Sequence, residues 1–217
     1  MRKWLVILGT VLLFLGVITL VVWPSVKDNM IEDTASPTAV PAEKKGKEAL
    51  IQLVANNKKK AVDFTVKDVQ RPTVKAVLAA QKNKEQKEAA LVGNIKIASV
   101  GLDLDILQGT TTQNLLYGAT TIREDQVMGQ GNYVLLGHHM KRDSLLFSPL
   151  MNVKNGAVIV ISDYDKSYRY KVNDIQVVNE DEAHVMEETE DNRLTLITCD
   201  KSTETDKRLV ITATLIP

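Results

Sequence analysis

The chain begins with an uncharged, mostly apolar run that is long enough to cross a membrane. Trp4 to Trp23 form twenty consecutive positions without an Asp, Glu, Lys or Arg. As an α-helix rising about 1.5 Å per residue, this run spans roughly 30 Å, the thickness of a bilayer's hydrocarbon core. A tryptophan, which favours the membrane–water interface, stands at each end. We therefore expect residues 1–23 to form a cytoplasmic tip and a transmembrane anchor.

The charges beside this run predict its orientation. Arg2 and Lys3 precede it, and the positive-inside rule keeps such residues in the cytoplasm. The expected location is the cell membrane, crossed once, with everything after Pro24 outside. The alternative is a cleaved signal peptide, whose apolar core is typically about 7–15 residues and precedes small residues at a cleavage site. Here the run is longer and ends in Val-Val-Trp-Pro, which favours the uncleaved anchor.

The next part of the chain has the composition of a linker. Residues 24 to about 60 contain three prolines, small polar residues and many lysines, which is typical of a flexible or weakly helical segment. We predict a stalk over residues 24–73, outside the membrane, and a catalytic domain over residues 74–217. That domain opens with a predicted helix over 74–91, which is rich in Ala, Lys, Glu and Gln, begins after Pro72 and ends before Gly93.

Short alternating segments dominate the rest of the domain. Polar and apolar residues alternate at 94–97, 167–172 and 193–198, and less regularly at 209–215, as in half-buried strands. Turn signals such as Gly109 separate these segments. Many short strands over about 125 residues predict a mainly β fold that closes into a barrel or packs as a sandwich.

The chain has one cysteine, Cys199. In an exported domain an unpaired Cys indicates a reactive thiol or intermolecular pairing. The alternative is a small buried hydrophobic residue, the usual place of a free Cys in a cytosolic protein. Nucleic acid is not an expected partner, because the formal net charge is zero and no large basic surface is indicated.

Three residues of the β region have the chemistry for nucleophilic catalysis. Cys199 follows an alternating segment and precedes a loop-like stretch, which places the thiol at the end of a strand. A Cys nucleophile needs a proton acceptor and a donor to the oxyanion of the tetrahedral intermediate. His138 and Arg208, both in strand-like segments, are the candidates, although their spacing alone does not distinguish a site from a chance pairing.

The motifs around these residues resemble the sortase family. Thr-Leu-Ile-Thr-Cys at 195–199 matches the TLxTC signature, Gly137-His138 matches the family's histidine segment, and Arg208 lies nine residues after the Cys. The similarity runs from about residue 93 to 216. The segments that look like class A sortases of Gram-positive bacteria are 115–119, 125–129, 131–133 and 146–150.

The resemblance implies an eight-stranded sortase β-barrel with short helices and a groove holding Cys, His and Arg. It implies cleavage of an LPxTG-type sorting signal between Thr and Gly, with a thioester on Cys199. An amine of a peptidoglycan precursor, on lipid II, would then attack the thioester. The expected partners are LPxTG-bearing surface-protein precursors, lipid II with its cross-bridge amine, and the membrane.

The resemblance also selects the role of each residue. Cys199 would be the nucleophile and His138 the proton carrier, while His139 would point to the opposite face because successive strand side chains alternate. Arg208 would stabilise the oxyanion or fix the substrate backbone. The alternative for Arg208 is an ordinary surface charge that balances Asp200 or Asp206.

A pocket for the substrate's Leu-Pro is expected beside the thiol. Thr198 would border it and donate a backbone or hydroxyl hydrogen bond to the oxyanion. The loop over residues 179–193 corresponds to the segment that covers the substrate in sortases. The expected pocket wall consists of Leu136, Ile197, Ala183, Val185 and Met186, and the alternative for the three loop residues is ordinary packing against the barrel.

No cofactor or metal is expected to be required. Some class A sortases use calcium to tie the substrate loop to the loop before the His strand. Calcium takes about 6–8 oxygen ligands. Beside the acidic run at 187–191, this sequence offers only Glu124 and Asp125 on the other side. Calcium binding is therefore possible without being needed.

Three other functions stay open on sequence alone. A cysteine endopeptidase or hydrolase would use the same residues and pass the acyl group to water. A non-enzymatic, stalked surface-binding module would give no reason for the TLITC motif. A pilin-polymerising sortase would be expected to carry a lid over the site and usually a C-terminal hydrophobic segment. This sequence shows neither feature clearly.

Overall fold

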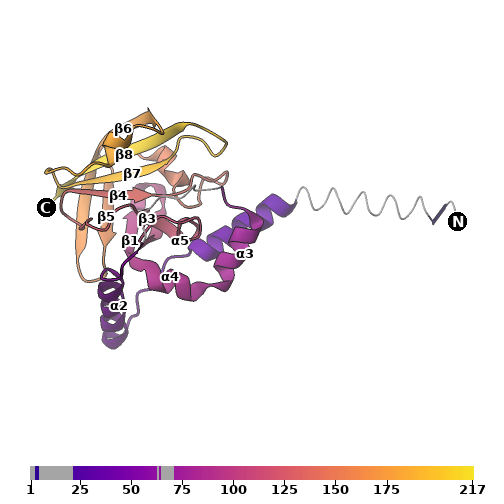
Figure 1. Cartoon of the computed structure of the whole chain (residues 1–217), viewed down its shortest axis with the longest axis horizontal. Helices are drawn as coiled ribbons and strands as arrows, with labels where there is room; N and C mark the ends of the chain where they lie inside the picture. The colour runs from indigo at the N-terminus through magenta and orange to yellow at the C-terminus, as the bar shows by residue number, and fades with distance from the viewer. Residues whose placement is uncertain (1–2, 5–21, 63, 65–70) are drawn as a thin grey trace.

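Eight strands in the described part of the chain close into a barrel (Figure 1). The computed structural model describes residues 3–4, 22–62, 64 and 71–217. The strands are β1 (Leu91–Ile97), β2 (Leu102–Leu107), β3 (Gly118–Thr121), β4 (Asn132–Leu136), β5 (Val158–Ser162), β6 (Ser167–Asn179), β7 (Arg193–Cys199) and β8 (Lys207–Ile216). They follow the order β1-β2-β3-β4-β7-β8-β6-β5, and β5 pairs with β1 to close the barrel. The predicted closed, mainly β fold is confirmed.

The alternating segments of the sequence all lie in strands. They belong to β1, β6, β7 and β8. β7 lies between β4, which runs parallel to it, and β8, which runs antiparallel. Because β4 to β7 and β7 to β8 are neighbours, the ends of these three strands meet at one place on the barrel.

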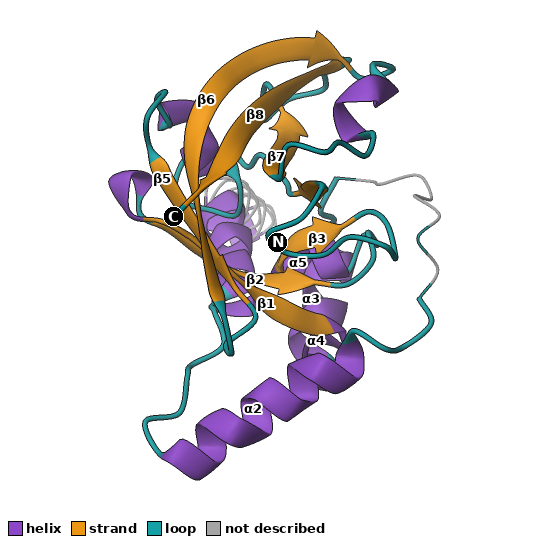
Figure 2. Ribbon diagram, turned by 90° about the vertical axis from the view of Figure 1, so that its left-hand side faces the viewer, coloured by secondary structure: helices purple, strands orange, loops and turns teal. Residues whose placement is uncertain are grey.

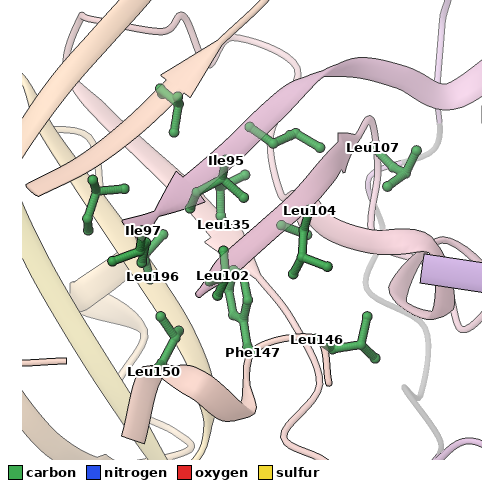
Figure 3. Close-up of a cluster of buried hydrophobic side chains, with 14 of the residues drawn as sticks. Ile95, Ile97, Leu102, Leu104, Leu107, Leu135, Leu146, Phe147, Leu150 and Leu196 are labelled. Carbon is green, nitrogen blue, oxygen red and sulfur yellow. The ribbon is translucent and has the colours of Figure 1, made fainter. Parts of the chain in front are cut away.

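Leu, Ile and Val side chains make up most of the buried core, with Phe147 among them (Figure 3). Leu135 of β4, Leu196 of β7 and Phe147 are fully buried. Gly137, directly after β4, has to be a glycine here, since a Cβ atom at this position would lie 2.5 Å from the Phe147 ring. The close approach of Phe147 therefore fixes the chain immediately before His138.

Helices pack on the outside of the barrel (Figure 2). Residues 22–35 are helical. The other helices are α2 (Lys44–Asn57), α3 (Val74–Lys82), α4 (Lys84–Ala90) and α5 (Asn114–Tyr117), with 3₁₀ turns η1 (Ala98–Val100), η2 (Ser148–Asn152) and η3 (Ala183–Met186). The single helix predicted over 74–91 is two helices, because the backbone of Asn83 leaves the helical region (φ −117°, ψ 58°).

The described part of the predicted stalk is packed against the barrel. Ile31 and Val54 bury their side chains in the main core. Between the helices, the backbone N–H of Thr38 donates to the buried carboxylate of Asp105 over 2.9 Å, and Lys87 pairs with the same carboxylate at 2.9 Å. The segment expected to be flexible or weakly helical is helical over 22–35 and in α2, and its docking was not expected, since a lysine-rich composition does not reveal the apolar face beneath it. The division into stalk and catalytic domain stays a prediction.

The predicted membrane anchor falls mostly on residues that the structure does not describe. Of the run from Trp4 to Trp23, only residues 4, 22 and 23 belong to the described part. Within that part, no helix has the length and apolar character needed to cross a membrane.

Candidate active site

The register of β4 and β7 brings His138 and Cys199 to the same level. These strands are parallel, with Leu136 opposite Ile197, and the N–H of Gly137 continues the pairing by donating to the carbonyl oxygen of Ile197 over 3.2 Å. His138 follows Leu136 by two positions, and Cys199 follows Ile197 by two positions. Cys199 shares the face of Ile197, because side chains two apart in a strand share a face. His138 lies just beyond the end of β4 and lines the same cavities as Cys199.

The register of β7 and β8 adds Arg208. Cys199 is the last residue of β7 and lies directly opposite Arg208 in the antiparallel pair. Directly opposite side chains point to the same face. The three residues selected from the sequence therefore come from the ends of three neighbouring strands, and the predicted position of Cys199 at a strand end is confirmed.

The imidazole of His138 is neutral at neutral pH. Burial lowers the pKa of His138 to about 4, and the positive charge of Arg71 lowers it further. Its Nε2 atom is buried and has no hydrogen-bond partner among the described residues. A neutral imidazole with an unpaired nitrogen is able to accept a proton from a thiol.

His139 contacts the backbone of Cys199. Its Nδ1 atom lies 2.9 Å from the carbonyl oxygen of Cys199, and since a carbonyl only accepts, Nδ1 carries the hydrogen. Neither histidine lies in β4, and His139 forms an isolated bridge with Leu146. In a continuing strand, His139 would point to the opposite face from His138. Here both histidines line one cavity beside Cys199, and of the two only His138 also lines a second cavity.

Arg208 is oriented by contacts at the rim of the site. Its guanidinium pairs with Glu180 at 2.5 Å and donates to the carbonyl oxygens of Thr205 (3.2 Å) and Lys207 (3.0 Å). Neither Asp200 nor Asp206 is its ion-pair partner in the described part of the chain. Three of the guanidinium's five N–H donors are engaged, which leaves two for a substrate.

Two cavities meet at His138 and Cys199. The smaller, of about 320 Å³, lies on the Arg208 side. The larger, of about 420 Å³, lies on the His139 side. Arg71, His138 and Cys199 line both cavities. The thiol and the imidazole therefore stand at a junction that two different groups can approach from different sides.

The Arg208-side cavity contains part of the expected substrate pocket. Leu136, Ile197 and Thr198 line it. The Thr198 hydroxyl is buried without a hydrogen-bond partner among the described residues, which is unusual unless a ligand supplies one. Thr110 and Leu115 also line it; the sequence reasoning did not select them, although Leu115 belongs to a segment noted for its resemblance to sortases.

The loop between β6 and β7 extends this wall. Val185 and Met186 pack beside Leu136 and Ile197 in a small apolar cluster next to the cavity. Ala183 is exposed and lies outside both that cluster and the cavity lining. The structure therefore brings four of the five expected wall residues together and leaves Ala183 apart.

Arg123 ties that loop to the loop between β3 and β4. Its guanidinium pairs with Glu188 and donates to the carbonyl oxygens of Met186 (2.5 Å) and Asn132 (3.2 Å). The guanidinium of Arg123 thus links these two loops. Over the described residues, no three His, Cys, Asp or Glu side chains are grouped to hold a metal ion.

Comparison with known proteins identifies the family. Residues 95–216 match the sortase domain model. Sortase A of Listeria monocytogenes is 45% identical over 157 residues, which is 72% of this chain and 70% of that protein. Sortase A of Bacillus anthracis is 37% identical over 148 residues, covering 68% and 69% of the two chains.

The chain belongs to the sortase family.

The crystal structure of the Listeria sortase A superposes with a TM-score of 0.58 at 50% identity, covering 59% of this chain and 88% of that one. The protein is a sortase-type enzyme that resembles class A members from Gram-positive bacteria. Sortases are cysteine transpeptidases that anchor surface proteins, so this sortase is an enzyme and not a non-enzymatic binding module.

Proposed function

We propose that this sortase cleaves an LPxTG-type sorting signal between Thr and Gly and transfers the new carboxyl end to an amine of lipid II. The observation that carries the proposal is the strand register that sets Cys199 between His138 and Arg208 at the junction of two cavities. One cavity is available for the sorting signal and the other for the amine.

The first half of the reaction forms a thioester. The sulfur of Cys199 attacks the carbonyl carbon of the substrate Thr while neutral His138 takes the thiol proton. The carbonyl oxygen becomes an oxyanion, which the remaining donors of Arg208 stabilise. The C–N bond to Gly then breaks as His138 returns the proton to the leaving amine.

The second half reverses these roles. The amine of the acceptor attacks the thioester carbonyl carbon, His138 accepts a proton from that amine, and the C–S bond breaks. The departing thiolate of Cys199 takes the proton from His138, so the enzyme returns to its starting state. A new amide bond joins the surface protein to the wall precursor.

The location follows from the anchor. Residues 4–23 would hold the enzyme in the cell membrane, with residues 1–3 in the cytoplasm and the catalytic domain outside. Exported precursor proteins and lipid II would then share the membrane surface with the site. The expectation that no cofactor or calcium is required is part of this proposal.

Product analysis distinguishes this reaction from hydrolysis. An LPxTG peptide is incubated with the enzyme, with and without triglycine, and the products are identified by mass spectrometry. We expect an LPxT–triglycine product when the amine is present. If the peptide is only hydrolysed whatever the triglycine concentration, the enzyme is a cysteine endopeptidase.

A further inference from the structure

We infer that the second half of β6 is a contact surface for a second copy of this chain, which pairs with it antiparallel, edge to edge. The inference goes beyond the proposed reaction and does not depend on it. It concerns the stretch from Asp174 to Asn179, which ends at the loop that borders the substrate pocket. Figure 2 shows β6 at the outside of the barrel, with β8 along one side.

β6 is paired along nearly its whole length on one side but only in part on the other. β8 pairs with residues 169–179, whereas β5 pairs only with residues 167–171. Val172 makes the last contact on the β5 side, where its carbonyl oxygen accepts from the N–H of Gly156 over 2.8 Å. The stretch after Val172 therefore has an unpaired edge within the described part of the chain.

The hydrogen-bond register identifies the free backbone groups on this edge. The N–H of Glu180 donates to the carbonyl oxygen of Asp206 over 2.7 Å, and these residues lie directly opposite each other in the continued β6–β8 register. Because hydrogen-bonded pairs alternate along antiparallel strands, every second residue before Glu180 directs its backbone polar groups at β8. Those of Ile175 and Val177, which lie in between, point away from β8, and no described residue bonds to them.

The free edge carries little protection against pairing. Its central sequence, Ile-Gln-Val-Val at 175–178, has no charge and no proline, whereas natural edge strands are usually blunted by lysine, proline, a bulge or a covering segment. The bulge between Val172 and Asp174 precedes this stretch. Val177 is 54% exposed. An uncharged edge with an exposed β-branched side chain favours pairing with another strand.

A second copy fits this edge because β6 is complementary to itself. With Gln176 opposite the partner's Gln176, the free groups of Ile175 face those of the partner's Val177, and the reverse holds on the other side of the axis. Each of these two pairs exchanges both of its N–H···O bonds. Val177 also lies against the partner's Ile175, and pairs of β-branched side chains stabilise sheets. A two-fold axis through this point makes the two halves of the contact identical.

The charges at the two ends of β6 favour the same arrangement. The strand begins with Arg169 and Lys171 among its exposed residues and ends beside Glu180 and Asp181. An antiparallel copy sets the basic end of one strand beside the acidic end of the other, so that Asp181 comes towards the partner's Lys171. Lys171 and Asp181 form no ion pair with another described residue. A parallel copy would instead place like charges side by side, which destabilises a strand pair.

Disulfide trapping tests this register directly. Single cysteines are introduced into the full chain carrying Cys199→Ala, which is held in a neutral detergent and oxidised with copper phenanthroline. Gln176→Cys places two thiols opposite each other at the axis, within the reach of a disulfide, and we expect a covalent dimer. Trapping is the appropriate measurement because a contact as small as one strand pair is weak in dilute solution.

Asp174→Cys is the matched control, since residue 174 is exposed and lies two positions from Gln176 on the same face of β6. In the inferred register it lies opposite the partner's Val178. At about 3.4 Å per residue it is about 14 Å along the strand from its own copy, too far for a disulfide, and we expect little dimer.

A second variant tests the edge itself. Val177→Lys, added to Gln176→Cys, places a charge on the unpaired edge and is expected to abolish the cross-link. The midpoint of thermal unfolding should stay close to that of the parent, because Val177 is exposed.

Three results would overturn the inference. The first is the absence of a covalent dimer from Gln176→Cys, and the second is equal dimer formation by Gln176→Cys and Asp174→Cys or an unchanged cross-link with Val177→Lys. The third is a disulfide between Gln176→Cys and an extended cysteine-containing peptide without any dimer, which would assign the edge to a peptide. Each of these results would leave the proposed transpeptidase reaction standing.

Discussion

The imidazole of His139 donates a hydrogen bond of 2.9 Å to the backbone carbonyl oxygen of Cys199. This contact fixes the end of β7 and keeps the His139 ring engaged with the backbone. His138, whose Nε2 atom has no partner in the described structure, is the ring left to move protons. We therefore expect the two neighbouring histidines to have different tasks: His138 would transfer protons and His139 would position Cys199.

Replacing each histidine separates these tasks. His138→Ala is expected to lower kcat/KM by about 10²–10⁴-fold, the usual contribution of general acid–base catalysis. His139→Ala should lose roughly tenfold or less, in keeping with one lost hydrogen bond. His139→Asn, which keeps a short N–H donor, should recover most of that loss. Equal losses in the two alanine variants would show that both rings move protons.

The pKa of His138 predicts the acid limb of the pH–rate profile. Burial and the charge of Arg71 favour the neutral ring, with a pKa of about 4, so activity falls only when the pH drops towards that value. Removing the positive charge in Arg71→Ala should raise the pKa of His138 and shift the acid limb upwards. NMR titration of the ring tests this directly, and a wild-type midpoint near the ordinary value of about 6.5 would contradict it.

Arg208 is expected to depend on its shape as well as its charge. Arg208→Lys keeps the charge but loses the forked donor, so kcat should fall about 10²-fold or more, as for other lost oxyanion donors. Lys207→Ala, at the exposed neighbouring position, is the matched control and should be nearly neutral. Near-normal turnover by Arg208→Lys would show that Arg208 contributes only its positive charge.

Arg123 is expected to replace calcium as the link between the two loops. Transpeptidation should proceed in excess chelator and change little when millimolar calcium is added. Arg123→Ala removes the contacts to Met186 and Glu188 and should raise KM for the peptide several-fold with a smaller effect on kcat. A several-fold rise in wild-type activity on adding calcium would make the acidic loop a metal site.

Sequence reasoning succeeded where one local motif carries the information. The TLITC segment lies in β7, between β4 and β8. Its alternating pattern and its motif together predicted that Cys199 lies at the end of a strand, and it does. The strand-like segment before His138 corresponds to β4, but β4 ends at Leu136. Residues 132–135 are buried throughout, and a strand buried on both faces shows no alternation from which its end could be predicted.

The remaining features depend on contacts between distant segments. Arg71 and Leu115 reach the site from parts of the chain far from the motif. No local pattern marks Arg71, and the resemblance of the segment around Leu115 does not assign that residue to the site. The pairing of Arg208 with Glu180 likewise joins β8 to a loop 28 residues earlier. The docking of the helix over 22–35 could not be foreseen, because its buried face is short and lies among polar and acidic residues.

The central claim is that Cys199 carries the acyl group. The most direct test is intact-mass spectrometry of the full chain, quenched in acid shortly after mixing with an LPxTG peptide, followed by peptide mapping. We expect a mass increase equal to the LPxT acyl fragment, located on Cys199, that disappears when triglycine is added and is absent from Cys199→Ala. Peptide cleavage by Cys199→Ala at a rate near that of wild type, with no adduct on the wild-type thiol, would contradict the account.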